Sequence, residues 1–218
     1  MNQPVEWRHT EFARVISCTR CTSATDSNLL RDNGENVPQP GYIGPLYRTA
    51  RVLLVGRNPG TPNSKTPKSL AVPDRAYTAS LRTLRMDPTL EHYKELTAIL
   101  KGFIPRWPIA NYFPLAESNL ALEDIAYCNI VRCRTKDAIA PSELLAQQCV
   151  SEHFVRWLNL LAPRIVVFVN KTAWSQGRSA VDAKGIPCTF MNGKRSLSPT
   201  ERAANRAAVV ALIRQHRG

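Results

Sequence analysis

The stretch Arg51-Val52-Leu53-Leu54-Val55-Gly56-Arg57-Asn58-Pro59-Gly60 decides the fold. Residues 52–55 form a short, unbroken apolar run, which is typical of a strand buried on both faces of a parallel sheet. Gly56 ends the run, and Pro59-Gly60 then forces a turn. Asn58 is therefore delivered to the carboxyl edge of the sheet, where open α/β proteins bind ligands. By itself the stretch favours an ordinary strand-to-loop turn, because Asn, Pro and Gly are common turn formers.

The rest of the chain alternates strands with helices. Three further strands are predicted, over residues 125–131, 164–169 and 186–191. Helices are predicted over residues 6–17, 76–85, 90–102 and 141–161, and two more begin at residues 171 and 199. We expect residues 22–48 to be largely loop and residues 61–75 to be a mobile loop. The pattern predicts a single domain, residues 1–218, with a three-layer α/β/α fold around a mostly parallel four-stranded sheet.

Composition narrows the class of protein. The chain has 218 residues, with 29 Lys and Arg against 17 Asp and Glu, and its net charge is +12. Such an excess suits a polyanionic partner, most often nucleic acid, although it also serves solubility alone. No apolar run approaches membrane-spanning length, and the N-terminus lacks a signal-peptide core. We therefore expect a cytoplasmic, soluble monomer that binds DNA and no membrane.

Six cysteines raise the question of a metal site. Without a secretion signal, disulfides are not expected. Cys18 and Cys21 form a CxxC pair, which can direct two thiolates at one metal or cluster. Cys133 and Cys149 lie far along the chain and would complete a set of four. By spacing alone an iron–sulfur cluster, a zinc site and a pair of small core residues all remain open.

Asparagines recur where the predicted strands end. Asn58 follows the first strand, Asn129 lies in the second and Asn192 follows the fourth, beside a basic loop. An amide presents both a donor and an acceptor, so it suits recognition of a base edge. The set contains no paired carboxylates of a sugar hydrolase and no Gly-rich Lys-Ser/Thr loop of a nucleotide triphosphatase.

In this order the motifs resemble the uracil-DNA glycosylase superfamily, and specifically its iron–sulfur, family-four-like branch. The quoted features are Cys18 with Cys21, the segment Gly56-Arg57-Asn58-Pro59-Gly60, Asn129 with Cys133, and Cys149. The resemblance implies a [4Fe–4S] cluster held by Cys18, Cys21, Cys133 and Cys149 that pins loops near DNA. Cys128 and Cys188 are then core thiols.

The resemblance also implies an activity. It is hydrolysis of an N-glycosidic bond in DNA after the nucleotide is flipped into a pocket. Asn58 would position the attacking water. The base-binding residues would be Gly56, Pro59 and Asn129, with Tyr77 as a stacking candidate. Asn192 would stabilise the leaving base. DNA would be clamped by Lys194, Arg195, Ser196 and Leu197, with Leu197 as a candidate wedge.

The chain departs from the branch in its pocket. The branch usually has an acidic residue near Asn58, a stacking Phe, and a His at the start of the leaving-base loop. Here the region near Tyr77 aligns loosely, and no His lies near Asn192. Because these changes fall in the pocket, we expect uracil only slightly ahead of another base as the target. A modified pyrimidine, such as those of phage DNA, would indicate a role in antiviral defence. A non-catalytic iron–sulfur nucleic-acid-binding protein is the alternative from another class.

Overall fold

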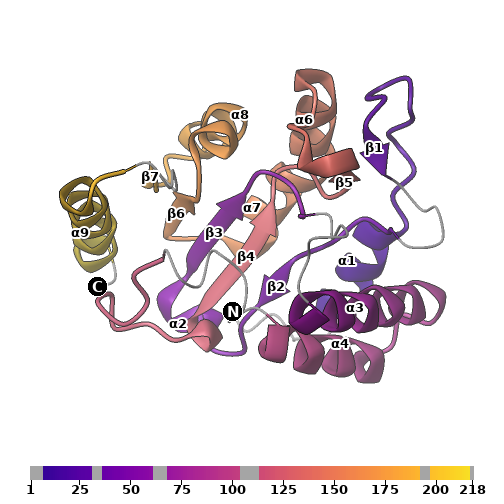
Figure 1. The fold of residues 1–218 in the computed structure, drawn as a ribbon. Helices are drawn as coiled ribbons and strands as arrows, with labels where there is room; N and C mark the ends of the chain where they lie inside the picture. The colour runs from indigo at the N-terminus through magenta and orange to yellow at the C-terminus, as the bar shows by residue number, and fades with distance from the viewer. Residues whose placement is uncertain (1–6, 31–35, 61–67, 104–112, 192–196, 217–218) are drawn as a thin grey trace. The chain divides into compact units, whose positions relative to one another are not determined.

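The computed structural model describes residues 7–30, 36–60, 68–103, 113–191 and 197–216 (Figure 1). These residues fall into two compact units that alternate along the chain. The first unit contains residues 1–40, 58–106 and 132–145, and the second contains residues 41–57, 107–131 and 146–218. The chain passes from the second unit to the first between Arg57 and Asn58, inside the segment 51–60.

The second unit is built on a five-stranded sheet with the order β2-β4-β3-β6-β7. The strands are β2 (Tyr42–Ile43), β3 (Val52–Gly56), β4 (Ile125–Asn129), β6 (Ile165–Phe168) and β7 (Cys188–Phe190). All neighbours are parallel except β2, which pairs antiparallel with β4. Figure 1 shows β3 beside β4 in this sheet. The sheet is therefore mostly parallel, as the sequence predicts.

Every residue of β3, β4 and β6 is buried, so both faces of the central strands are covered. Strands of this kind read as continuous apolar runs because neither face meets water. Both α8 (Lys171–Asp182) and α9 (Pro199–His216) pack on β6 and β7. A Cβ atom at Gly177 of α8 would stand 2.7 Å from the Phe168 ring, so only glycine permits this approach. The result is the mixed α/β architecture predicted for the chain.

The remaining elements of the second unit are short or follow one another on a single helical path. They are α2 (Tyr47–Ala50), the 3₁₀ turn η2 (Leu122–Asp124), the π-helical segment η4 (Val150–Phe154) and α7 (Val155–Leu161). The N-terminus of α8 is capped by Asn170, whose Oδ1 accepts from the Ala173 N–H at 2.8 Å. At α9, Ser198 and Glu201 form a reciprocal cap just before and after Pro199.

The first unit is largely helical. It contains α1 (Trp7–Ile16), α3 (Lys68–Met86) and α4 (Leu90–Phe103), which pack against one another. The rings of Phe12 and Tyr93 meet edge to face, with their centroids 5.1 Å apart. Two short strands, β1 (Leu29–Leu30) and β5 (Arg134–Thr135), pair antiparallel, and β5 continues into the 3₁₀ turn η3 (Lys136–Ala138). Helix α6 (Glu143–Cys149) begins in this unit and ends in the other.

Several boundaries differ from the prediction. The sheet has five strands rather than four, because β2 lies in a segment too rich in turn residues to predict as a strand. Residues 68–75, expected in a mobile loop, belong to α3, which continues through Pro73. The predicted helix over residues 141–161 is one path interrupted by the π-helical η4. Among the described helices, none is long and apolar enough to cross a membrane.

Candidate active site

The carboxyl ends of β3 and β4 meet in register in the second unit. Gly56 is the register partner of Asn129, and each is the last residue of its strand. The pairing continues beyond the strands, because the Ile130 N–H donates to the Gly56 carbonyl at 2.8 Å and the Val131 N–H donates to the Arg57 carbonyl at 2.9 Å. Asn129 therefore stands on a rigid strand end, at the edge where parallel sheets bind ligands.

The Asn129 amide is held in place by its own strand and by Gly56. The Tyr127 hydroxyl donates to Asn129 Oδ1 at 2.7 Å, and both residues are buried. A Cβ atom at Gly56 would stand 2.2 Å from the same Oδ1, so the amide occupies the space that any other residue would fill. The sequence analysis assigned Gly56 and Asn129 to the base pocket but missed Tyr127. Tyr127 could have been found from its position two residues before Asn129, because residues two apart lie on the same face of a strand.

Asn58 belongs to the first unit, where Thr135 holds its side chain. Asn58 Nδ2 donates to Thr135 Oγ1 at 3.0 Å, and Thr135 Oγ1 in turn donates to the Ile139 carbonyl at 2.5 Å. Asn58 is half-buried, whereas Thr135 is completely buried. The predicted water-positioning residue is thus fixed through a threonine that the sequence analysis did not identify. No periodic pattern marked residues 133–140, so nothing in the sequence alone pointed to Thr135.

A buried ion pair lies on the strand that carries Thr135. Arg134 and the Asp74 carboxylate form this pair, and Arg134 Nη1 also donates to Asn36 Oδ1 at 3.3 Å. Buried charges of this kind are stable only when paired, so the contact ties β5 to α3. Tyr77, the predicted stacking residue, lies about one turn after Asp74 in α3, and its side chain is 1% exposed. Its ring is in the core in this structure, and stacking on a base would require it to become accessible.

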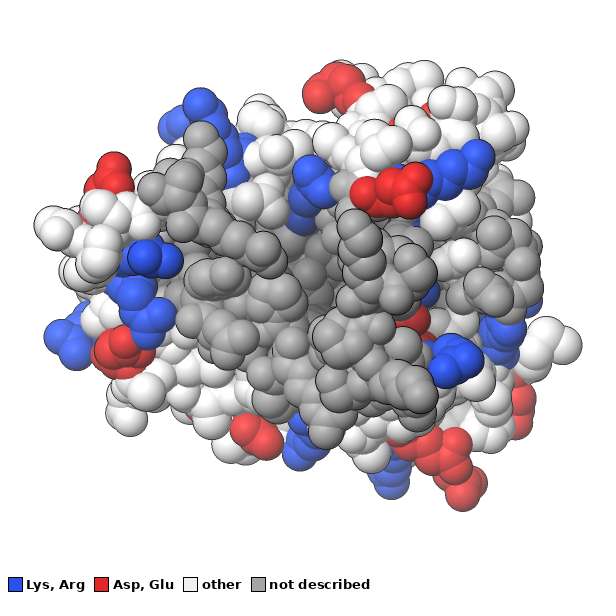
Figure 2. Space-filling view, viewed as in Figure 1, with Lys and Arg blue, Asp and Glu red and all other residues white. Residues whose placement is uncertain are grey.

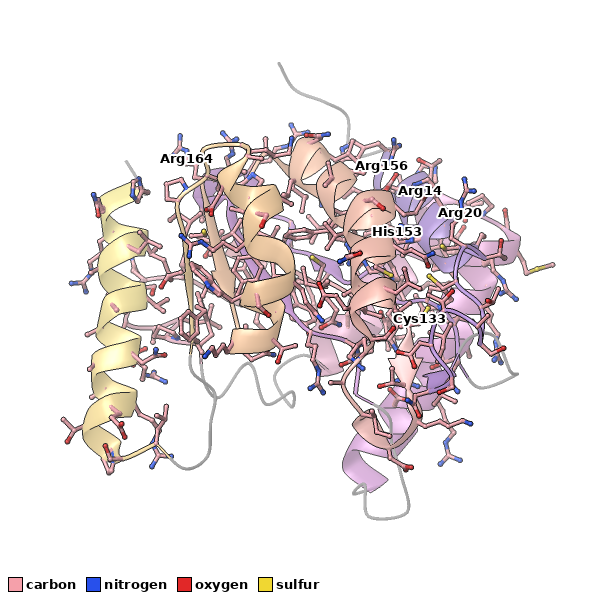
Figure 3. All side chains as sticks on the ribbon, turned by 90° about the horizontal axis from the view of Figure 1, so that it is seen from above. Arg14, Arg20, Cys133, His153, Arg156 and Arg164 are labelled. Carbon is pink, nitrogen blue, oxygen red and sulfur yellow. The ribbon has the colours of Figure 1, made fainter. Side chains whose placement is uncertain are left out.

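The cysteines have the chemistry of a metal site, although no assembled site is seen. None of the six forms a disulfide, and Cys21, Cys133 and Cys149 are buried while Cys18 is partly exposed. Cys18, Cys21 and Cys133 belong to the first unit; Figure 3 labels Cys133 and, in the same unit, Arg14 and Arg20. Cys149 ends α6 in the second unit, directly before the π-helical η4 that carries the buried His153. Within the described ranges, no group of three or more His, Cys, Asp or Glu side chains is arranged to hold a metal ion.

The turn that follows the CxxC pair is anchored to the residue before α6 within the first unit. Asp26 Oδ2 accepts from the Ser142 N–H at 2.7 Å, and Ser142 Oγ donates to the Thr25 carbonyl at 3.1 Å. Asp26 Oδ1 also accepts from the Asn28 N–H at 2.8 Å. Partial burial alone would raise the pKa of Asp26, but these hydrogen bonds outweigh it and lower the pKa below 3.8.

The predicted leaving-base and DNA-clamping residues lie mostly outside the described ranges. These are Asn192, Lys194, Arg195 and Ser196. Leu197, the candidate wedge, is described and is half-buried just before α9. Figure 2 shows basic side chains beside acidic ones where α9 lies. There Arg206 pairs with Glu117, so some of the positive charge on this helix is already neutralised.

Comparison with known proteins identifies the class of this arrangement. The family model of the uracil DNA glycosylase superfamily matches residues 44–212, which include Asn58, Asn129 and four of the five strands of the sheet, namely β3, β4, β6 and β7. No curated protein matches the chain.

Proposed function

Because this chain belongs to the uracil DNA glycosylase superfamily, we propose that it is a DNA glycosylase that hydrolyses the N-glycosidic bond of a flipped-out base. One observation carries the proposal: Asn129 ends β4 in register with Gly56, the last residue of β3, and Asn58 follows Gly56 by two residues along the chain. The chain therefore carries amides at or just beyond the carboxyl ends of two neighbouring parallel strands, the kind of position where α/β proteins bind ligands.

The reaction consumes one water. The water oxygen forms a bond to C1′ of the deoxyribose while the C1′–N bond breaks and its electron pair leaves with the base. The water loses a proton and the departing base gains one, so the products are an abasic site and the free base. An amide is too weak a base to take that proton, so Asn58 contributes by orienting the water.

Asn129 is the residue we propose to read the base. Its amide is a donor and an acceptor at one point, so it can pair with the Watson–Crick edge of a flipped base. Tyr127 occupies one lone pair of Asn129 Oδ1, which fixes the plane of the amide before the base arrives. A preset amide discriminates because a base with the wrong pattern leaves a buried polar group unpaired.

We also propose that Cys18, Cys21, Cys133 and Cys149 hold the [4Fe–4S] cluster implied by the resemblance. Four thiols outside any disulfide supply the donor set that such clusters use. The role that the resemblance implies for such a cluster is to hold loops near DNA rather than to take part in redox chemistry. None of the hydrolytic steps above passes through the cluster.

The test is abasic-site formation on three DNAs: one with a single uracil, one with normal bases and one with phage-type modified cytosines. Asn58→Ala and Asn129→Ala are measured beside Asn159→Ala, which changes an exposed asparagine of α7. We expect one DNA to be cleaved, with a loss of about 100-fold or more for Asn58→Ala and full activity for Asn159→Ala. If no DNA releases a base while DNA binding is retained, the chain is a binding protein rather than a glycosylase.

A further inference from the structure

The Thr135 hydroxyl is hydrogen-bonded to both Ile139 and Asn58 but has only one proton. Its oxygen lies 2.5 Å from the Ile139 carbonyl oxygen and 3.0 Å from Asn58 Nδ2. A carbonyl can only accept, so the hydroxyl proton must point at Ile139. The Thr135 oxygen is then an acceptor toward Asn58, and the Asn58 amide must present its NH₂ group to it. This argument orients the amide by chemistry, independently of how its two ends are assigned.

The orientation determines what Asn58 presents to a ligand. With Nδ2 bonded to Thr135, the oxygen Oδ1 lies on the other branch of the amide. An acceptor binds a water through one of its protons and leaves both lone pairs of the water oxygen available for attack. A flipped amide would instead donate to one of these lone pairs and would offer no acceptor to the water protons. We propose that Thr135 is a positioning residue that keeps Asn58 Oδ1 toward the attacking water; this inference rests on the proposed function.

The fold holds Thr135 and Ile139 in this relation through local backbone structure. Thr135 pairs with Leu29 across the β1–β5 ladder, and the Lys136 N–H donates to the Asn28 carbonyl at 2.8 Å. The chain then reverses through Asp137, whose φ of 49° and ψ of 27° are left-handed. Aspartate tolerates that conformation better than most residues. The reversal returns the Ile139 carbonyl to Thr135, so the proton acceptor belongs to the main chain and cannot rotate away.

The experiment is a kinetic double-mutant cycle on the DNA that the wild-type protein cleaves. Thr135→Val keeps the shape of the side chain and removes the hydroxyl, whereas Thr135→Ser keeps the hydroxyl. The matched control is Thr78→Val, because Thr78 is also buried in the first unit and its hydroxyl donates to the Asp74 carbonyl at 3.0 Å. Single-turnover rate constants and DNA dissociation constants are measured for each variant, with and without Asn58→Ala.

We expect Thr135→Val to lower the single-turnover rate about 10- to 100-fold with an unchanged dissociation constant, because the water is misplaced and not the DNA. Thr135→Ser should restore most of the rate, and Thr78→Val should leave it within about twofold. In the Asn58→Ala background, Thr135→Val should have no further effect, because there is no amide left to orient.

Three results would overturn the inference. They are a wild-type rate for Thr135→Val, an equal loss for Thr78→Val, and the same fold-loss with and without Asn58. If the wild-type protein cleaves DNA and the variants give one of these results, the proposed function stands and only the role of Thr135 is excluded. If the wild-type protein cleaves none of the DNAs, both the function and the role of Thr135 are excluded.

Discussion

Asn129 lies against the backbone of Gly56, so closely that a Cβ atom at position 56 would stand 2.2 Å from Asn129 Oδ1 and 2.6 Å from the Tyr127 hydroxyl. Neighbouring strands of a sheet normally leave room for a side chain at every position. Here the side chains of β4 occupy that room on β3. A glycine on one strand therefore determines where an amide on the next strand can stand.

Gly56→Ala should displace the Asn129 amide from its position and lower the single-turnover rate of base release by about 10-fold or more. The added methyl group meets side-chain atoms that can move, so the protein should still fold. Gly102→Ala is the control, because a Cβ atom at Gly102 of α4 meets nothing within 4 Å. An active Gly56→Ala variant would show that Asn129 does not need its present position.

Tyr127→Phe removes the hydroxyl that holds Asn129 Oδ1 at 2.7 Å and keeps the ring. The amide can then rotate, so we expect the preference for the cleaved base over other bases to fall about 3- to 10-fold, the usual worth of one hydrogen bond. The measurement is the ratio of kcat/KM values for the competing DNAs. Tyr47→Phe is the matched control, since the buried Tyr47 hydroxyl has no hydrogen-bond partner among the residues that the structure describes. An unchanged ratio in Tyr127→Phe would exclude this role.

Asp26→Asn should destabilise the protein by about 1–3 kcal/mol at pH 7, because it weakens two charge-assisted bonds to backbone N–H groups. The folded pKa of Asp26 lies below 3.8, so its stabilisation is present above that pH and is lost as the pH falls through the folded pKa. The difference between wild type and variant in free energy of unfolding should therefore shrink below about pH 3.8. Urea unfolding across pH checks this. Glu95→Gln, an exposed change in the same unit, is the control variant.

Cys133→Ser should remove the bound iron and the absorbance near about 400 nm that thiolate-bound iron–sulfur clusters show. Cys188→Ser should retain both. Cys188 lies outside the proposed ligand set, and its Sγ donates to the Asp182 carboxylate, Sγ to Oδ1 at 3.6 Å. A wild-type protein purified without oxygen that contains no iron or sulfide would end the cluster proposal.

The central strands were predictable because burial on both faces leaves an unbroken apolar run. Residues 52–56, 125–129 and 165–168 form strands within the predicted ranges. The two-residue strands β1, β2 and β5 were missed, since they carry too few residues for any period to be read. The extension of α3 back to Lys68 was missed as well, because a proline such as Pro73 normally marks a helix boundary.

The sequence by itself determined that one buried strand ends at Gly56, that Asn129 lies in another, that an amide follows at Asn58, and which family these motifs resemble. Only the tertiary structure decided how the amides are held. The Asn58 side chain is hydrogen-bonded to Thr135, 77 positions along the chain, and the Asn129 side chain lies against Gly56 of the neighbouring strand. Hydrophobic periodicity is a local property that one segment displays alone. The orientation of a polar side chain depends on a partner that only folding brings within hydrogen-bonding distance.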